Sequence, residues 1–227
     1  MRKIFILIIL TLLSANFIYA QQESSENDAV KTLRLLENKY KGVITFTGEF
    51  DQIKKSEMLL EEIKSNGQFY YEKPDRFRCD YAKPNESINI FVKDSAWVYV
   101  PELKQVEKYY IGTGDSNAGE SLNQMLIGFG VSTDDLLKKY TITVKNKKDN
   151  MIDISLIPKT DELKKEYKEI VVTIDQGKLL PVKFIITETN DEATEIMMKE
   201  IKDDNPKIDA KVFELNFPKD VEIIEQD

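Results

Sequence analysis

The stretch that decides the fold runs from Gly67 to Tyr110 and reads GQFYYEKPDRFRCDYAKPNESINIFVKDSAWVYVPELKQVEKYY. Short runs rich in Phe, Tyr, Ile and Val recur in it about every eight to twelve residues. Turn-forming Pro, Asp, Asn and Ser separate these runs at residues 73–75, 83–85, 93–95 and 100–102. The pattern predicts a meander of antiparallel strands joined by tight connections.

Strand patterns flank this meander on both sides. Residues 43–53 and 57–72 predict two strands at its start, whereas residues 160–168 fit either a helical turn or a loop. Further strands are predicted after it, at residues 140–146, 151–158, 169–175, 180–189, 193–202 and 213–217. About eleven strands in one domain, residues 21–227, form a sheet that must curl or close.

Two regions have helical rather than strand periodicity. Near the N-terminus, Val30, Leu33, Leu36 and Tyr40 recur at three to four residues and predict an amphipathic helix that stops at Gly42. The second region, residues 112–140, predicts two short helices. These helices could form a lid over the sheet or could simply fill one end of it, and the pattern favours neither.

The first residues have the composition of a secretory signal peptide. Arg2 and Lys3 precede an apolar stretch at residues 4–13, and Ala20 offers a small residue at a cleavage point. This stretch is too short for a membrane span, which needs about 20 residues. We therefore expect residues 1–20 to be removed. The next residue, Gln21, is not a Cys, so no lipid anchor is expected there.

Composition limits the chemistry. The chain has no His, a single Cys and a net charge of −8. The lack of His argues against Ser-His catalysis and His-based metal sites, and the negative charge argues against nucleic acid as a partner. We expect neither an enzyme nor a metal or cofactor site. The lone Cys79 is expected to be a buried small hydrophobe.

Alternation within the meander predicts one apolar wall. Phe77, Cys79 and Tyr81 share one parity, while Arg78 and Asp80 share the other. Such a wall either packs as a solid core or lines a cavity, and alternation alone fits both.

An ordered set of short motifs resembles the LolA family of periplasmic lipoprotein carriers. It extends over approximately Ala29 to Ile224, and its pieces are Gly67, Lys73-Pro74, Phe77-Arg78, Pro84, Glu86-Ser87-Ile88, residues 97–101, Gln105-Val106, residues 157–159, residues 180–182 and residues 212–218. No single piece is diagnostic, but their order is.

The resemblance implies an α+β, mainly β fold: an incomplete, unclosed antiparallel β-barrel with an N-terminal helix and a short helical lid. It also implies an apolar cavity for acyl chains. The residues that we expect to line it are Phe50, Phe69, Tyr71, Phe77, Cys79, Tyr81, Ile88, Ile90, Leu122, Met125 and Leu126.

The resemblance further implies a lid latch. The family's usual residue before the first meander proline is Arg, and here it is Lys73, so we expect a weaker or rearranged latch, with Arg78 as a substitute. A solvated lysine at a turn is an equally good interpretation of Lys73.

The implied role is a monomeric periplasmic carrier of acylated lipoproteins. Its implied partners are a LolCDE-type ABC transporter at the inner membrane and a LolB-type receptor at the outer membrane. A lipoprotein-sensing or lipid-binding regulatory module of the RseB type is the alternative.

Overall fold

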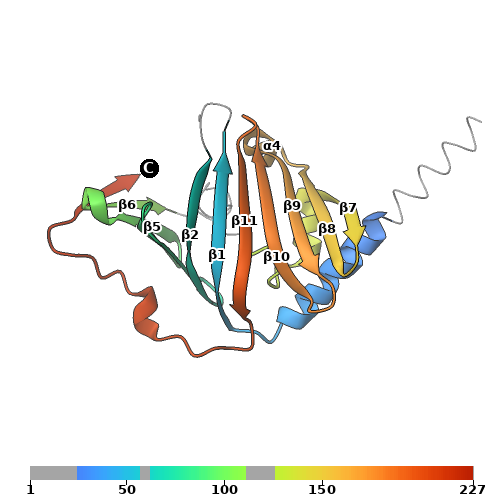
Figure 1. The fold of residues 1–227 in the computed structure, drawn as a ribbon, viewed down its shortest axis with the longest axis horizontal. Coiled ribbons are helices and arrows are strands. Elements are labelled where there is room, and N and C mark those ends of the chain that lie inside the picture. The colour runs from blue at the N-terminus through green and yellow to red at the C-terminus, as the bar shows by residue number, and fades with distance from the viewer. Residues whose placement is uncertain (1–24, 57–61, 111–125, 227) are drawn as a thin grey trace, which may run out of the picture.

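The computed structural model describes residues 25–56, 62–110 and 126–226. Its strands form one sheet in the order β12-β6-β5-β4-β3-β2-β1-β11-β10-β9-β8-β7 (Figure 1). Eleven of them form an antiparallel series, and β12 joins β6 in parallel. In that order β12 and β7 are the outermost strands, so the sheet is unclosed, as predicted.

The strand bounds follow the sequence pattern closely, apart from the last. The strands are β1 (Thr45–Lys55), β2 (Ile63–Glu72), β3 (Arg76–Tyr81), β4 (Ser87–Val92), β5 (Ser95–Val100), β6 (Gln105–Tyr110), β7 (Tyr140–Lys148), β8 (Met151–Pro158), β9 (Tyr167–Asp175), β10 (Leu180–Glu188), β11 (Ala193–Lys202) and β12 (Glu222–Gln226).

The predicted final strand at residues 213–217 is wrong. Residues Ala210–Phe213 form a short 3-10 helix, η2, and the last strand is β12. The aromatic residues of this region are not part of a hydrogen-bonded strand. Instead, Phe213 is buried and Phe217 packs its ring against Trp97.

The predicted N-terminal helix is present at residues 25–40 and lies at the β7–β10 side of the sheet (Figure 1). Leu33, Leu36 and Tyr40 are buried in the main core. At the start of the helix, the Ser25 hydroxyl bonds both the N–H and the C=O of Val144 on β7. The helix therefore covers the inner face at this end of the sheet.

Two short helices follow the predicted patterns. In α3 (Thr133–Lys139) the Ser132 hydroxyl caps the helix by accepting a hydrogen bond from the Asp135 N–H. For residues 160–168 the sequence fits either a helical turn or a loop, and the structure has a helical turn, α4 (Asp161–Glu166).

Residues 126–130 form a turn that contains Gly128 and Gly130. Most of the other predicted lid helix, including Leu122 and Met125, lies outside the described residues. No described helix has the length and apolarity to cross a bilayer.

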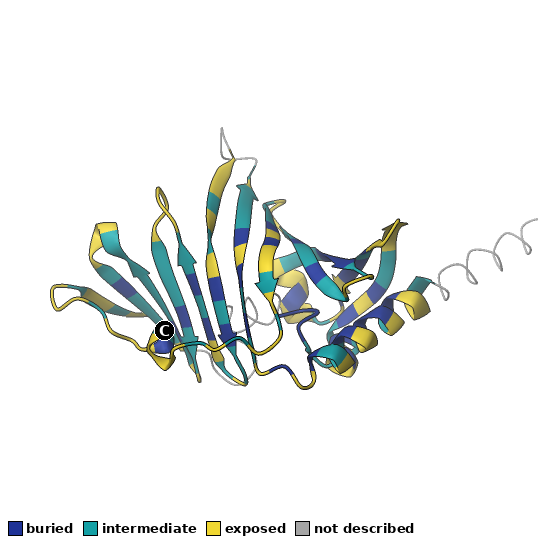
Figure 2. Ribbon diagram, turned by 60° about the horizontal axis from the view of Figure 1, so that its bottom comes forward, coloured by how far each residue is buried: buried dark blue, intermediate teal, exposed yellow. Residues whose placement is uncertain are grey.

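The register defines two faces of the sheet. On the inner face, which holds the main core, Phe77 pairs with Phe91 and Cys79 with Asn89. On the outer face, Arg78 pairs with Ile90. Buried and more exposed positions alternate along the strands accordingly (Figure 2).

Candidate binding face and its closing junction

Aromatic rings cover the inner face of β1–β4. The ring centroids of Phe46 and Tyr71 are 4.6 Å apart, those of Phe69 and Phe77 6.4 Å, and those of Phe77 and Phe91 5.9 Å. Phe46 with Tyr71 and Phe77 with Phe91 are paired in the register of neighbouring strands, and Phe69 and Phe77 are diagonal neighbours. They form a continuous apolar wall, which we call the aromatic wall.

Gly67 creates space within this wall. A Cβ atom there would lie 2.1 Å from the carbonyl oxygen of Asp80 and 2.9 Å from the ring of Phe50. Gly67 pairs with Phe50 and with Tyr81, whose rings meet edge to face at 5.0 Å. Without a side chain, Gly67 lets these two rings meet across the strand between them.

Cys79 lies within the wall and is buried. Burial, with a smaller effect from the charge of Asp80, raises the pKa of its thiol. A thiol held neutral in this way is a poor nucleophile. Cys79 therefore behaves as the small hydrophobe that its sequence position predicts.

The inner face becomes less covered towards β5. Phe91, Asn89 and Val98 are only half-buried there, in contrast to Phe69 and Phe77. The Oδ1 atom of Asn89 is buried and accepts no hydrogen bond from the residues that the structure describes. This part of the face combines apolar side chains with an unsatisfied acceptor.

Most predicted cavity residues are brought together. Leu126 joins the same core from the turn at residues 126–130, and the strand residues that meet there are Phe50, Phe69, Tyr71, Phe77, Cys79 and Tyr81. Ile88 and Ile90 are wrong as members of this group. They pair with Asp80 and Arg78, so they lie on the outer face.

Sequence reasoning missed three aromatic residues of the core and its margin: Phe46, Phe91 and Phe129. Phe46 shares the parity of Phe50, so alternation alone could have found it. Phe91 required the register between β3 and β4, and Phe129 required the position of the turn against the sheet.

Tyr40, the last residue of the N-terminal helix, is the centre of a junction. Its carbonyl oxygen accepts a hydrogen bond of 2.6 Å from the Lys73 ammonium, and its hydroxyl donates to Asp203 at 2.6 Å. Its ring meets that of Phe129 edge to face at 5.3 Å. The helix, the β2–β3 turn, residues 126–130 and the segment after β11 therefore meet at one residue. We call this set the Tyr40 junction.

The charges of the junction are tuned by its environment. Burial lowers the pKa of Lys73. For Asp203, burial alone would raise the pKa, but hydrogen bonds from Lys39 and Tyr40 outweigh it and lower the pKa. The Lys39 ammonium is 2.6 Å from the Asp203 carboxylate. Asp203 is thus held as a charged acceptor.

Gly130 brings the turn of residues 126–130 against the junction. Its φ of +92° favours glycine, and a Cβ atom there would lie 3.0 Å from Cβ of Tyr40 and 3.3 Å from Nζ of Lys73. Lys73 therefore bonds the helix end and lies beside this turn.

Arg78 belongs to a different contact. Its Nε donates to Asp80 at 2.6 Å and its Nη1 to the carbonyl of Val212 at 2.8 Å, both on the outer face. It does not share a latch with Lys73, so the prediction that grouped them is wrong. The segment that Arg78 holds also packs Phe217 against Tyr99, at 5.5 Å between ring centroids.

Comparison with known proteins agrees with this architecture. Residues 41–216 match the family described as "Outer membrane lipoprotein carrier protein LolA". An outer-membrane lipoprotein carrier protein of Legionella pneumophila (strain Lens) is 24% identical over 227 residues, which cover 100% of both chains.

Among solved structures, an uncharacterized conserved protein from Thermus thermophilus superposes with a TM-score of 0.52 at 9% identity, covering 86% of this chain and 98% of that one. MucB superposes with a TM-score of 0.50 at 10% identity, covering 82% and 62%. These two likenesses concern the fold alone. Because the family match extends over most of the sheet, the chain belongs to the LolA family of outer-membrane lipoprotein carrier proteins.

Proposed function

We propose that this protein carries lipoproteins by sheltering their acyl chains against the inner face of β1–β5. The observation that carries the proposal is the aromatic wall, which continues into the half-buried row of Phe91 and Val98. A wall that is apolar but incompletely covered at one end can accept a linear hydrocarbon without the loss of its own core.

Acyl chains require such a shelter. Each CH₂ removed from water contributes about 0.8 kcal/mol, so an anchor with two or three chains does not cross an aqueous space unprotected. Complete burial would approach the limit of non-covalent affinity, about −18 to −21 kcal/mol, and release would then be too slow. A carrier must therefore cover its cargo incompletely or close over it reversibly.

The Tyr40 junction provides a reversible closure in this proposal. Lys73 bonds the helix end through one flexible ammonium, whereas Arg would offer five donors in a rigid fork. A single bond at this position holds the helix end, against which Phe129 of the turn packs, without locking the turn.

The setting of this activity follows from the same proposal. The signal peptide, residues 1–20, leaves a single carrier domain, residues 21–227, in the periplasm. The domain acts as a monomer without catalysis. It receives lipoproteins from a LolCDE-type transporter of the inner membrane and passes them outward, to a LolB-type receptor where one exists.

Mass spectrometry of what co-purifies with the protein from a periplasmic extract tests the proposal. Acylated peptides are expected, and Phe91→Lys on the inner face should remove them. Phe217→Ala on the outer face is the matched control and should retain them. Phospholipid alone would contradict a lipoprotein carrier, and a bound regulatory protein domain would favour the sensor alternative.

A further inference from the structure

A second set of contacts, besides that of Lys73, holds the end of the N-terminal helix. It comes from residues 203–206, which follow β11 and lie outside any helix or strand. The Asp203 carboxylate accepts hydrogen bonds from the Tyr40 hydroxyl and from the Lys39 ammonium, each at 2.6 Å. We call residues 203–206 the clamp.

Asn205 makes the central contact of the clamp. Its Oδ1 atom accepts hydrogen bonds from the backbone N–H groups of Ile44, at 2.6 Å, and of Thr45, at 3.2 Å. Its φ of +59° lies in the left-handed region, which Asn adopts more readily than most residues. The Thr45 hydroxyl also donates to the carbonyl of Pro206 at 2.8 Å. The clamp therefore bonds the first residue of β1 and the residue before it.

The clamp and Lys73 hold the same short link, residues 41–44, between the helix and β1. Lys73 follows β2 and the clamp follows β11, and these two strands flank β1 in the sheet. The Lys73 N–H donates to the carbonyl of Ile44 at 2.8 Å, while its ammonium donates to the carbonyl of Tyr40. Asn205 bonds the N–H of the same Ile44. The link is thus held from both neighbouring strands.

The clamp contributes little to the core, because its contacts are polar and none of its residues belongs to the core cluster. The link that it bonds is open. Ile44 is 58% exposed, and a Cβ atom at Gly42 would have no heavy atom of the described residues within 4 Å beyond its chain neighbours. What the clamp fixes is the backbone at the helix end, where the Lys73 ammonium finds its acceptor.

We propose that Asn205 and Asp203 are positioning residues for the latch: they hold the Tyr40 carbonyl where Lys73 reaches it, and so set how fast the carrier releases an acyl cargo. The inference rests on the proposed carrier function. Neither residue belongs to the core that carries the aromatic wall, so both act through the helix end and not on the cargo itself.

Asn205→Gly is the most direct test, because glycine adopts the same φ without strain and removes the side-chain acceptor. Stopped-flow fluorescence measures the dissociation of a fluorescent diacylated lipopeptide. We expect it to be about fivefold faster, which corresponds to about 1 kcal/mol, the contribution of one hydrogen bond. Asn205→Asp keeps the acceptor and should retain the natural rate. Asp149→Gly, at an exposed turn residue with a φ of +53°, is the matched control and should also retain it.

A double-variant cycle distinguishes positioning from a structural role. In a Lys73→Leu background the latch bond is absent, so Asn205→Gly should speed dissociation no further. Asp203→Asn removes the charge that meets Tyr40 and Lys39, and it should behave in the same way with a smaller increase, about twofold. Should Asn205→Gly not fold, the cycle with Asp203→Asn decides the question.

The outcomes separate this inference from the carrier function. If the lipopeptide binds but Asn205→Gly releases it at the natural rate, the positioning role is overturned and the carrier function stands. The same holds if the effects of Asn205→Gly and Lys73→Leu multiply. If the natural protein does not bind the lipopeptide, the carrier function fails and the inference fails with it. Urea denaturation of each variant ensures that rates are compared between folded proteins.

Discussion

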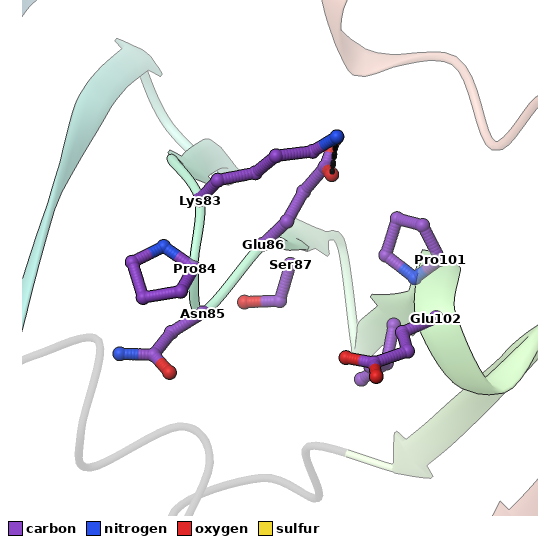
Figure 3. A pocket seen from close by; sticks show the side chains of 8 residues that line it. Lys83, Pro84, Asn85, Glu86, Ser87, Pro101 and Glu102 are labelled. Carbon is purple, nitrogen blue, oxygen red and sulfur yellow. Dashed lines mark ion pairs between the residues drawn. The ribbon is translucent and has the colours of Figure 1, made fainter.

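The two ends of the inner face differ in how completely they are covered. On β8 and β9, Ile152, Ile154, Ile170 and Val172 are all 0% exposed. On β4 and β5, Phe91 and Val98 are half-buried, although they occupy the same inner parity. The N-terminal helix lies at the first end, and a cleft lined by residues 83–87 and 100–102 opens beside the second (Figure 3).

This difference assigns different roles to the two halves of the sheet. The closed half, β7–β10, has a fully covered inner face. The open half, β2–β6, is covered at Phe69 and Phe77 but has inner surface to offer a ligand on β4 and β5. The Tyr40 junction connects them, because Tyr40 belongs to the helix of the closed half and Lys73 to a turn of the open half.

The largest expected effect comes from a matched pair of truncations, one in each half. Ile154→Ala should lower the free energy of unfolding by about 2–5 kcal/mol, because it leaves a cavity in a fully covered core. Phe91→Ala should cost less, about 1–2 kcal/mol, since its ring is already partly exposed. Urea denaturation measures both. Equal losses would remove the distinction between the halves.

Binding should show the opposite order. Phe91→Ala is expected to weaken the affinity for a fluorescent fatty acid about tenfold, and Ile154→Ala to leave it nearly unchanged while the protein remains folded. Titration at constant temperature, below both unfolding transitions, is the measurement. If Ile154→Ala weakened binding and Phe91→Ala did not, the ligand would lie in the closed half, against this account.

A smaller effect is expected where the halves meet. Lys73→Leu should cost about 1–2 kcal/mol, because the carbonyl of Tyr40 loses its charged donor. It should also speed the dissociation of an acyl ligand, measured by stopped-flow fluorescence. Lys73→Arg is the matched variant and should slow it, since the guanidinium offers more donors. Unchanged transfer of lipoprotein by Lys73→Leu would show that this contact is not a latch.

The pH dependence of the junction should be smaller still. Because the folded-state pKa of Asp203 is lowered, its contribution is complete above the unfolded value of about 3.9 and is lost as the pH falls through the folded value. Asp203→Asn should therefore cost about 1 kcal/mol at neutral pH and progressively less below about pH 4. Denaturation curves across this range measure the difference. A constant difference would mean that the charge of Asp203 is not involved.

The smallest effect on binding is expected from the outer face. Phe217→Ala removes a ring that packs on Trp97 and Tyr99, so the segment between β11 and β12 should be cleaved faster by protease. Fatty-acid affinity should not change. A loss of affinity would indicate that this segment, and not the inner face alone, controls binding.

Sequence periodicity predicted the positions of the strands well, but it predicted less well on which face of the sheet each residue lies. The bounds of β8 and β11 agree with the predicted strands, because each is a continuous run between turn residues. Residues 213–217 alternate apolar and polar side chains as a strand does, but the packing of Phe217 on Trp97 outweighs their strand propensity. The sequence pattern alone does not distinguish a strand that hydrogen-bonds within the sheet from a segment that packs against the face of the sheet.

The candidate site was predictable only within single strands. Alternation placed Phe77, Cys79 and Tyr81 on one face correctly. It could not relate β3 to β4, because the register across the turn between them decides whether Ile90 or Phe91 faces Phe77. Long-range contacts such as Lys73 with Tyr40 leave no local signal in the sequence.

The most direct test of this division of the sheet is photo-crosslinking with a diacylated lipopeptide that carries a diazirine in one acyl chain, followed by peptide mapping. We expect saturable labelling of the less covered inner face, at Tyr81, Phe91 and Val98, that unlabelled lipopeptide suppresses. Labelling confined to the outer face around Trp97, or labelling that unlabelled lipopeptide does not suppress, would contradict it.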